Sequence, residues 1–118
     1  MLSRHGSLEC AILGALWGLE KDGIYTNSVK DVYNILSQNS DEKRAYTTIK
    51  TVMDRLFEKK VLLRYKESKK FYYRTVYSNS EIIVKSLNEI ANRYCNNDLS
   101  LLSSVLNSMM EEEYLVSV

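Results

Sequence analysis

The sequence of 118 residues contains no proline, four glycines, one histidine and two cysteines. Without proline, and without a stretch rich in glycine and serine, no segment is typical of a flexible or proline-rich linker. No apolar run approaches the roughly 18 to 20 residues that a membrane helix needs, and the N-terminus lacks the pattern of a signal peptide. We therefore expect one cytoplasmic domain, with at most a small appendage and no contact with a membrane.

Residue types that carry chemistry are also scarce. Cys10 and Cys95 are far apart and His5 is the one histidine, so no spacing typical of a metal site occurs. Both cysteines lie in apolar helical patterns, and we expect buried thiols rather than a disulfide. The sequence has no nucleophile elbow, no glycine-rich phosphate loop and no histidine beside a nucleophile. The prediction is a protein that is not an enzyme and that needs no cofactor or metal.

Charge is unevenly distributed along the chain, although the formal net charge is only +1. Residues 43–77 carry 11 basic and 3 acidic side chains, whereas residues 1–42 and 78–118 are net acidic. A clustered positive surface releases counterions from nucleic acid, and this depends on the cluster rather than on the average charge. The alternative is a basic face that contacts only solvent. We favour nucleic acid as the partner.

Hydrophobic periodicity predicts a mainly α-helical chain with one small β-hairpin. The expected helices cover residues 7–19, 27–37, 46–59, 80–94 and a segment that starts near 98. Their expected caps are Ser7, either Thr26 or Asn27, and Ser80. Residues 24–26 are expected to form a short strand, and "VLLRYK" and "FYYRTVY" to form the hairpin around "ESKK". The hairpin loop lacks glycine and Asn-Gly, so the pattern leaves its turn type open.

This order of elements is that of a winged helix-turn-helix in residues 1–78, followed by a helical dimerisation region in residues 79–118. In helix-turn-helix proteins the second helix of the motif enters the major groove, with its N-terminal residues at the base edges. Here that helix would be residues 46–59, and the hairpin would be the wing.

Threonine is a poor helix former, yet "YTTIKT" places three threonines on the outer face of a helix start. A threonine hydroxyl can bond a phosphate or a base edge, and its methyl can rest on a thymine methyl. Basic side chains at a wing tip suit phosphates or the neighbouring minor groove. The alternative is an exposed helix with arbitrary polar residues. The predicted DNA-binding residues are Tyr46, Thr47, Thr48, Lys50, Thr51, Asp54 and Arg55 on the helix, and Arg64, Lys66, Lys69, Lys70 and Arg74 on the wing.

The two C-terminal helices carry apolar stripes that a single helix cannot bury. We expect both helices to be shared in a homodimer, because a two-fold protein matches a palindromic DNA site. The predicted dimerisation residues are Ile83, Leu87, Ile90, Tyr94, Leu99, Leu102, Leu106 and Met109.

Three motifs resemble the family of penicillinase repressors and methicillin-resistance repressors: "LECAILGALW", "YTTIKTVMDRLFEKK" and "FYYRTVYS". The resemblance implies a homodimeric repressor with an N-terminal winged helix that binds inverted repeats of TACA/TGTA type. It implies groove contacts by Thr48, Lys50 and Thr51, and a backbone contact by Arg55. Lys50 stands where the family usually has arginine, which weakens bidentate guanine recognition.

Other departures from the family pattern concern the ends of segments. Ala45 replaces a capping serine or threonine, so the cap either falls to Thr47 or is absent. Lys60 replaces a glycine just past the helix, which places a side chain in the left-handed region. The family's last helix, after "EEE", is missing or reduced to "YLVSV".

The family's inducing routes predict different partners. Its copper-responsive branch uses Cys-x-Cys pairs, which this sequence lacks. Its β-lactam branch is inactivated by a sensor protease, whose cut would fall near Asn107–Ser108. Our hypothesis is a homodimeric, sequence-specific transcriptional repressor. The alternatives are a ligand-sensing winged-helix regulator and a winged helix used as a protein-interaction module.

Overall fold

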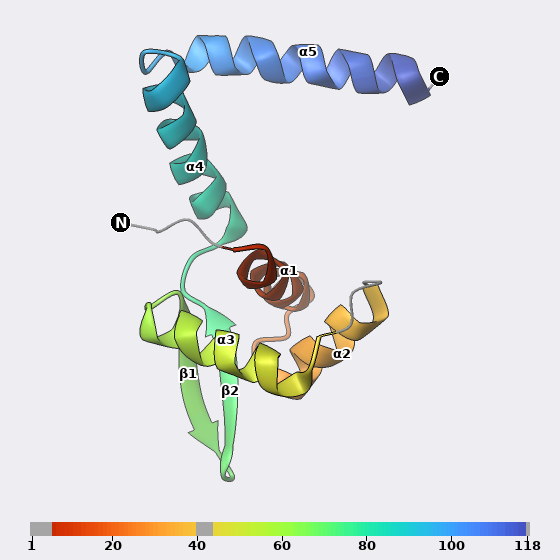
Figure 1. Ribbon diagram of the computed structural model, residues 1–118, viewed down its shortest axis with the longest axis vertical. Coiled ribbons are helices and arrows are strands. Elements are labelled where there is room, and N and C mark those ends of the chain that lie inside the picture. Colours follow the sequence, from red (N-terminus) through yellow and green to blue (C-terminus); the bar gives the residue numbers. More distant parts are fainter. Residues whose placement is uncertain (1–5, 40–43, 118) are drawn as a thin grey trace. The chain divides into compact units, whose positions relative to one another are not determined.

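The computed structural model describes residues 6–39 and 44–117, so His5 and Lys43 lie outside the described residues. The chain divides into two compact units, Met1–Asn79 and Ser80–Val118. Five helices and one two-stranded antiparallel sheet are described, and they confirm the predicted mainly α-helical winged-helix fold. Figure 1 shows α1, α2, α3 and the hairpin in the first unit and α4 and α5 in the second.

Helix α1 spans Ser7–Lys21 and α2 spans Val29–Asn39. The cap of α1 is Gly6 rather than Ser7, and the Gly6 N–H donates to Oε1 of Glu9 at 3.3 Å. At α2 the cap is Ser28: its hydroxyl accepts the Asp31 N–H at 3.3 Å, and the Asp31 carboxylate accepts the Ser28 N–H at 2.8 Å. This reciprocal pair outcompetes the neighbouring candidates because it satisfies two backbone donors at once.

The short strand predicted at residues 24–26 does not form. Instead, Asn27 makes an isolated bridge with Tyr73, whose N–H donates to the Asn27 carbonyl at 2.8 Å. The Asn27 side chain is buried and donates to the carbonyl of Ile24 at 2.9 Å. An amide that bonds back to the chain in this way favours a turn over an extended strand.

Helix α3 spans Tyr46–Glu58 and has no side-chain cap at Ala45, which settles the choice left open between Thr47 and no cap. It ends in a Schellman motif: the Lys60 N–H donates to the carbonyl of Phe57 at 3.0 Å, and the Val61 N–H to that of Leu56 at 3.0 Å. Lys60 has a φ of 65°, so the predicted left-handed side-chain position is confirmed.

Strands β1, Leu62–Glu67, and β2, Lys70–Thr75, form the hairpin. Glu67 pairs with Lys70, which leaves a two-residue loop of Ser68 and Lys69. Both loop residues have positive φ, at 50° and 67°, the pattern of a type I′ turn built without glycine or asparagine.

The core of the first unit receives side chains from all three helices and from the hairpin. Alternation along the strands turns Leu62, Tyr73 and Thr75 inward. The wing is tied to α1 by Trp17, whose indole N–H donates to the Tyr77 carbonyl at 2.9 Å. The buried apolar residues of the first unit are Ile12, Leu13, Ala15, Leu16, Val29, Val32, Ile49, Val52, Met53, Leu56, Val61, Leu62 and Tyr73.

The second unit contains α4, Asn79–Tyr94, and α5, Leu99–Ser117. Helix α4 already includes Asn79, so the predicted cap Ser80 lies inside the helix. Asn96 and Asn97 follow α4 with φ of 49° and 61°, and Asp98 then begins α5 by accepting the Ser100 N–H at 2.9 Å. The predicted break at "CNND" and the predicted start of the last helix are both confirmed.

The prediction of buried thiols is wrong for Cys10, which is exposed, while Cys95 is partly exposed. Cys10 lies one turn before Gly14 on the outer face of α1, whereas Ile12 and Leu16 face the core. Among the described residues, no helix combines the length and the apolar character needed to cross a membrane.

Candidate nucleic-acid interface

Helix α3 has one buried face and one exposed polar face. Ile49, Val52, Met53 and Leu56 are buried, which fixes the helix against the core. The predicted contact residues that α3 exposes to solvent are Tyr46, Thr47, Thr48, Lys50, Thr51 and Arg55. These side chains therefore all lie on the solvent-exposed side of α3.

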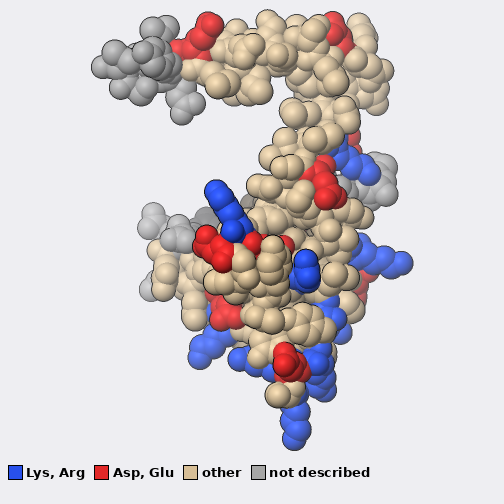
Figure 2. Space-filling view, turned by 180° about the vertical axis from the view of Figure 1, so that it is seen from behind, with Lys and Arg blue, Asp and Glu red and all other residues tan. Residues whose placement is uncertain are grey.

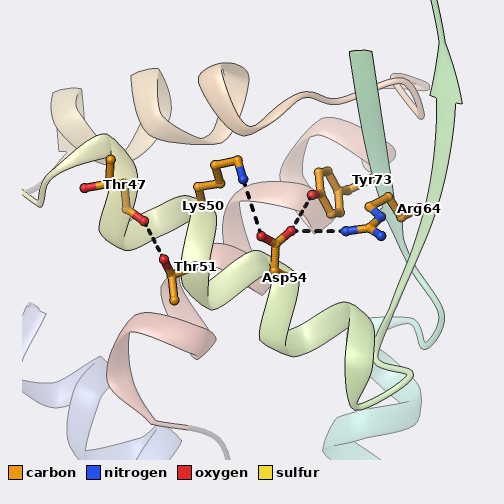
Figure 3. A network of polar contacts seen from close by, with 6 residues as sticks. All are labelled: Thr47, Lys50, Thr51, Asp54, Arg64 and Tyr73. Carbon is orange, nitrogen blue, oxygen red and sulfur yellow. Dashed lines mark hydrogen bonds and ion pairs between the residues drawn. The ribbon is translucent and has the colours of Figure 1, made fainter. Parts of the chain in front are cut away.

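The threonines at the start of α3 fit the helix by bonding to it. The Thr51 hydroxyl donates to the Thr47 carbonyl one turn earlier, at 2.9 Å (Figure 3). This back-bond satisfies the hydroxyl donor inside the helix. The exposed Thr51 side chain then keeps its acceptor capacity for a donor on a base edge, and its methyl group for a thymine methyl.

Asp54 is the centre of a polar network between α3 and the wing (Figure 3). Its Oδ1 accepts a hydrogen bond from Nη1 of Arg64 at 3.2 Å and another from the Tyr73 hydroxyl at 3.0 Å. Its Oδ2 lies 3.6 Å from the ammonium of Lys50, one turn back on the same helix. One carboxylate thus links α3 to both strands of the hairpin.

The Tyr73 ring is buried in the core, and only its hydroxyl reaches this network. Burial raises the pKa of Tyr73 above its ordinary value, and the hydrogen bond to Asp54 raises it further. Both effects favour the neutral phenol, which can donate to the carboxylate. The Tyr73 hydroxyl therefore faces Asp54 rather than solvent.

The wing presents most of its positive charge at and near its tip. Figure 2 shows Lys and Arg side chains gathered around the hairpin, at the lower end of the view. Lys69 is the second residue of the two-residue turn, at the end of the hairpin, and has a positive φ. The exposed basic residues of the hairpin are Lys66, Lys69, Lys70 and Arg74.

The strand register separates the basic residues of the wing into two groups. Arg64 pairs with Tyr73 on the hairpin face that turns toward α3, and its guanidinium lies over the rings of Phe57, at 4.0 Å, and Phe71, at 4.3 Å. Arg74 is one residue beyond Tyr73, so it belongs to the opposite face, where it lies 4.8 Å over the ring of Tyr25.

Sequence reasoning therefore named Asp54 and Arg64 but missed the residues that hold them. Phe57, Phe71 and Tyr73 were not among the predicted contact residues. A usable signal was Asp54 between Lys50 and Arg55 on the outer face of the helix, since a carboxylate there favours a cationic or hydrogen-bonding partner.

Comparison with known proteins identifies the family of the chain. A family model described as penicillinase repressor matches residues 5–117. The chain belongs to the penicillinase repressor family. Two curated relatives, both named transcriptional regulator BlaI, come from the CDC 1551 / Oshkosh and ATCC 25618 / H37Rv strains of Mycobacterium tuberculosis, and each is 32% identical over 82 residues.

The match to these two relatives covers 70% of this chain and 55% of each of them, so the chain spans about half the length of the curated relatives it matches. The match to the penicillinase repressor model is wider: it runs from just before α1 to the end of α5, across both units. The family resemblance predicted from the three motifs is confirmed.

Proposed function

We propose that this member of the penicillinase repressor family is a homodimeric transcriptional repressor that binds an inverted-repeat DNA operator. Helix α3 would enter the major groove, and the wing would contact the flanking backbone. The observation that carries the proposal is the exposed threonine and lysine face of α3 beside a strongly basic hairpin. Small hydroxyl and methyl groups allow a helix to approach base edges closely, and the basic residues supply phosphate contacts.

The start of α3 supports the same placement. Ala45 gives no side-chain cap, and the first turn holds no acidic residue, so neither position places a carboxylate at the positive end of the helix dipole. First-turn N–H groups in this state suit a DNA phosphate. A missing cap, which costs stability in an isolated helix, is then compatible with a helix that acquires an anionic partner on binding.

The second unit supports a dimer. Large apolar side chains cover α4 and α5, and many stay exposed: Ile83 is 52% exposed and Met109 is 59% exposed. Exposed apolar surface of this extent is typical of a protein interface. A second copy of the chain would cover it and would bring two recognition helices to the two half-sites of a palindrome.

A sensor protease stays a prediction of the proposed function. Asn107 and Ser108 are exposed residues of α5. A cut between them would divide the helix that carries Leu106 and Met109 and would remove part of the proposed dimer surface.

The test is a fluorescence anisotropy titration of the full chain with a duplex from the DNA upstream of its own gene. Binding should weaken steeply with salt. Thr51→Ala should reduce the preference for this duplex over a shuffled sequence. Lys69→Ala should weaken binding to both duplexes and lower the salt slope by about 0.9, the share of one phosphate contact.

The matched control is Lys85→Ala, which removes the same charge from α4 and should leave DNA affinity unchanged. Sedimentation velocity of the same samples should show a dimer. No binding at low salt, or binding that does not depend on salt, would contradict the proposal.

A further inference from the structure

The Asp54 carboxylate is shared between two structural tasks, and the following inference about it rests on the proposed DNA-binding function. Toward the wing, Oδ1 accepts hydrogen bonds from Arg64 at 3.2 Å and from Tyr73 at 3.0 Å. Toward the groove-facing side of α3, Oδ2 faces Lys50 at 3.6 Å. A single acidic group thus stands between two cations that the proposed interface would otherwise offer to DNA.

The wing side of this network is well ordered by its surroundings. The Arg64 guanidinium lies 4.0 Å from the centre of the Phe57 ring of α3 and 4.3 Å from that of the Phe71 ring of β2. The Arg64 side chain is only 25% exposed. Rings on α3 and β2, together with the carboxylate, hold a planar cation in one orientation, and this fixes the hairpin relative to the recognition helix.

Lys50 is held less tightly by Asp54 than Arg64 is. The Lys50 side chain is 56% exposed, and its ion pair with Asp54 is long and open to solvent. Such a pair is weak, so a favourable contact with a base edge or phosphate can displace it. Arg64, by contrast, would have to leave two aromatic rings as well as the carboxylate. The two cations therefore differ in how readily they can reach DNA.

We propose that Asp54 is a positioning and specificity-determining residue. It fixes the wing against α3 through Arg64 and Tyr73, and it offsets the charge of Lys50 until a matching sequence gives Lys50 a better contact. Its negative charge also opposes the phosphates of any duplex. The consequence is weaker binding to non-operator DNA and a larger difference between operator and non-operator affinities.

The test compares Asp54→Asn with Glu58→Gln in the full chain. Both variants remove one carboxylate charge from α3, but Glu58 is an exposed residue one turn beyond Asp54, at the last position of the helix and outside the network of Lys50, Arg64 and Tyr73. Anisotropy titrations use the upstream duplex and a shuffled duplex at several salt concentrations. For Asp54→Asn we expect shuffled-duplex binding to tighten by roughly two- to five-fold. The salt slope should steepen by about 0.9, because a released cation reaches one more phosphate.

The expected results separate this role from plain structural support. A loosened wing alone would weaken binding to both duplexes without steepening the salt slope. Tyr73→Phe keeps the carboxylate charge and removes one donor from it. It should lower the ratio of upstream to shuffled affinity while leaving the salt slope unchanged, and it tests the positioning role even if Asp54→Asn does not fold.

The inference and the proposed function fail in different ways. If the unaltered chain binds neither duplex, the proposed function is wrong. If it binds, but Asp54→Asn behaves like Glu58→Gln, the charge role of Asp54 is overturned. An unchanged affinity ratio in Tyr73→Phe would overturn the positioning role.

Discussion

The two units of the chain differ in how far their apolar side chains are buried. In the unit up to Asn79, residues such as Leu16, Met53 and Leu56 are completely buried. In the unit from Ser80 onward, Ala91 is the one buried apolar residue among those whose side chains are described, although α4 and α5 are rich in leucine, isoleucine and methionine. The first unit encloses its own core, whereas the second presents an apolar surface that association would cover.

This difference shows what each part of the sequence encodes. The first unit has four elements, three helices with distinct buried stripes and one hairpin, and together they exclude water from a shared core. The second unit has two helices, each with a stripe of its own, and nothing in the described second unit covers both. Its stability is therefore expected to depend on protein concentration, while that of the first unit is not.

The largest effect should come from removing equal side-chain volume in the two units. Leu56→Ala empties a fully buried site in the first unit and should lower the free energy of unfolding by about 2 to 5 kcal/mol. Leu106 is 52% exposed in the single chain, so Leu106→Ala should act mainly by weakening the proposed dimer.

The measurement is chemical denaturation at two protein concentrations that differ widely. The loss in Leu56→Ala should be the same at both, and the loss in Leu106→Ala should appear only where the dimer is populated. If Leu106→Ala lowered the free energy of unfolding by several kcal/mol at both protein concentrations, the proposed difference between the two units would be wrong.

A smaller effect should follow from untying the wing from α1. Glu20 accepts the Thr75 N–H at 3.0 Å and the Thr75 hydroxyl at 2.7 Å, and Thr75 is buried. Glu20→Ala leaves both donors without this acceptor and should cost about 1 to 3 kcal/mol. Glu20→Gln keeps one acceptor oxygen and should cost less. Thermal unfolding of both variants gives the order, and equal losses would show that charge rather than hydrogen bonding matters.

A gain in stability is expected at the exit of α3. Lys60 has a φ of 65°, a conformation that costs a side chain with a Cβ roughly 1 kcal/mol. Lys60→Gly should therefore stabilise the first unit by about 0.5 to 1 kcal/mol. The control lies in the second unit: Asn97 has a φ of 61°, but asparagine tolerates this region, so Asn97→Gly should gain less. A loss in Lys60→Gly would show that the lysine side chain contributes elsewhere.

The sequence predicted the elements better than their ends. The stripe Ile49, Val52, Met53 and Leu56 located α3 to within one residue of its observed end, because the spacing of buried residues is a long-range signal. Caps were missed because adjacent polar residues compete for the same role, and only three-dimensional bonding decides between them. Ser28, which caps α2 in place of Thr26 or Asn27, is one such case.

The exposed surface of the candidate site could be predicted from the sequence, but the polar contacts between its side chains could not. The spacing that buries Ile49 also exposes Thr48 and Lys50, so the contact face follows from the helix itself. The contact of Asp54 with Arg64 depends on how the hairpin docks on α3 and on which strand face turns inward. A shift of one residue in the strand register would turn Arg64 and Tyr73 to the opposite face of the hairpin. The turn sequence "ESKK" gave no basis for predicting this register.

The smallest effect should be a local response to acid at the start of α5. Two bonds from Ser100, first from its hydroxyl and then from its N–H, lower the pKa of Asp98 below its ordinary value of 3.8. A lowered pKa in the folded chain means that the capping contribution is fully present above pH 3.8 and is lost as the pH falls through the lowered value. The first unit responds in the opposite direction, because the pKa of Tyr73 is raised above 10.0, so its contribution is lost only as the pH rises beyond that. Circular dichroism between about pH 5 and pH 2, the range that spans carboxylate titration, should show a small loss of helix that begins below pH 3.8. Asp98→Asn caps without titrating, and an identical acid step in that variant would assign the loss to other carboxylates.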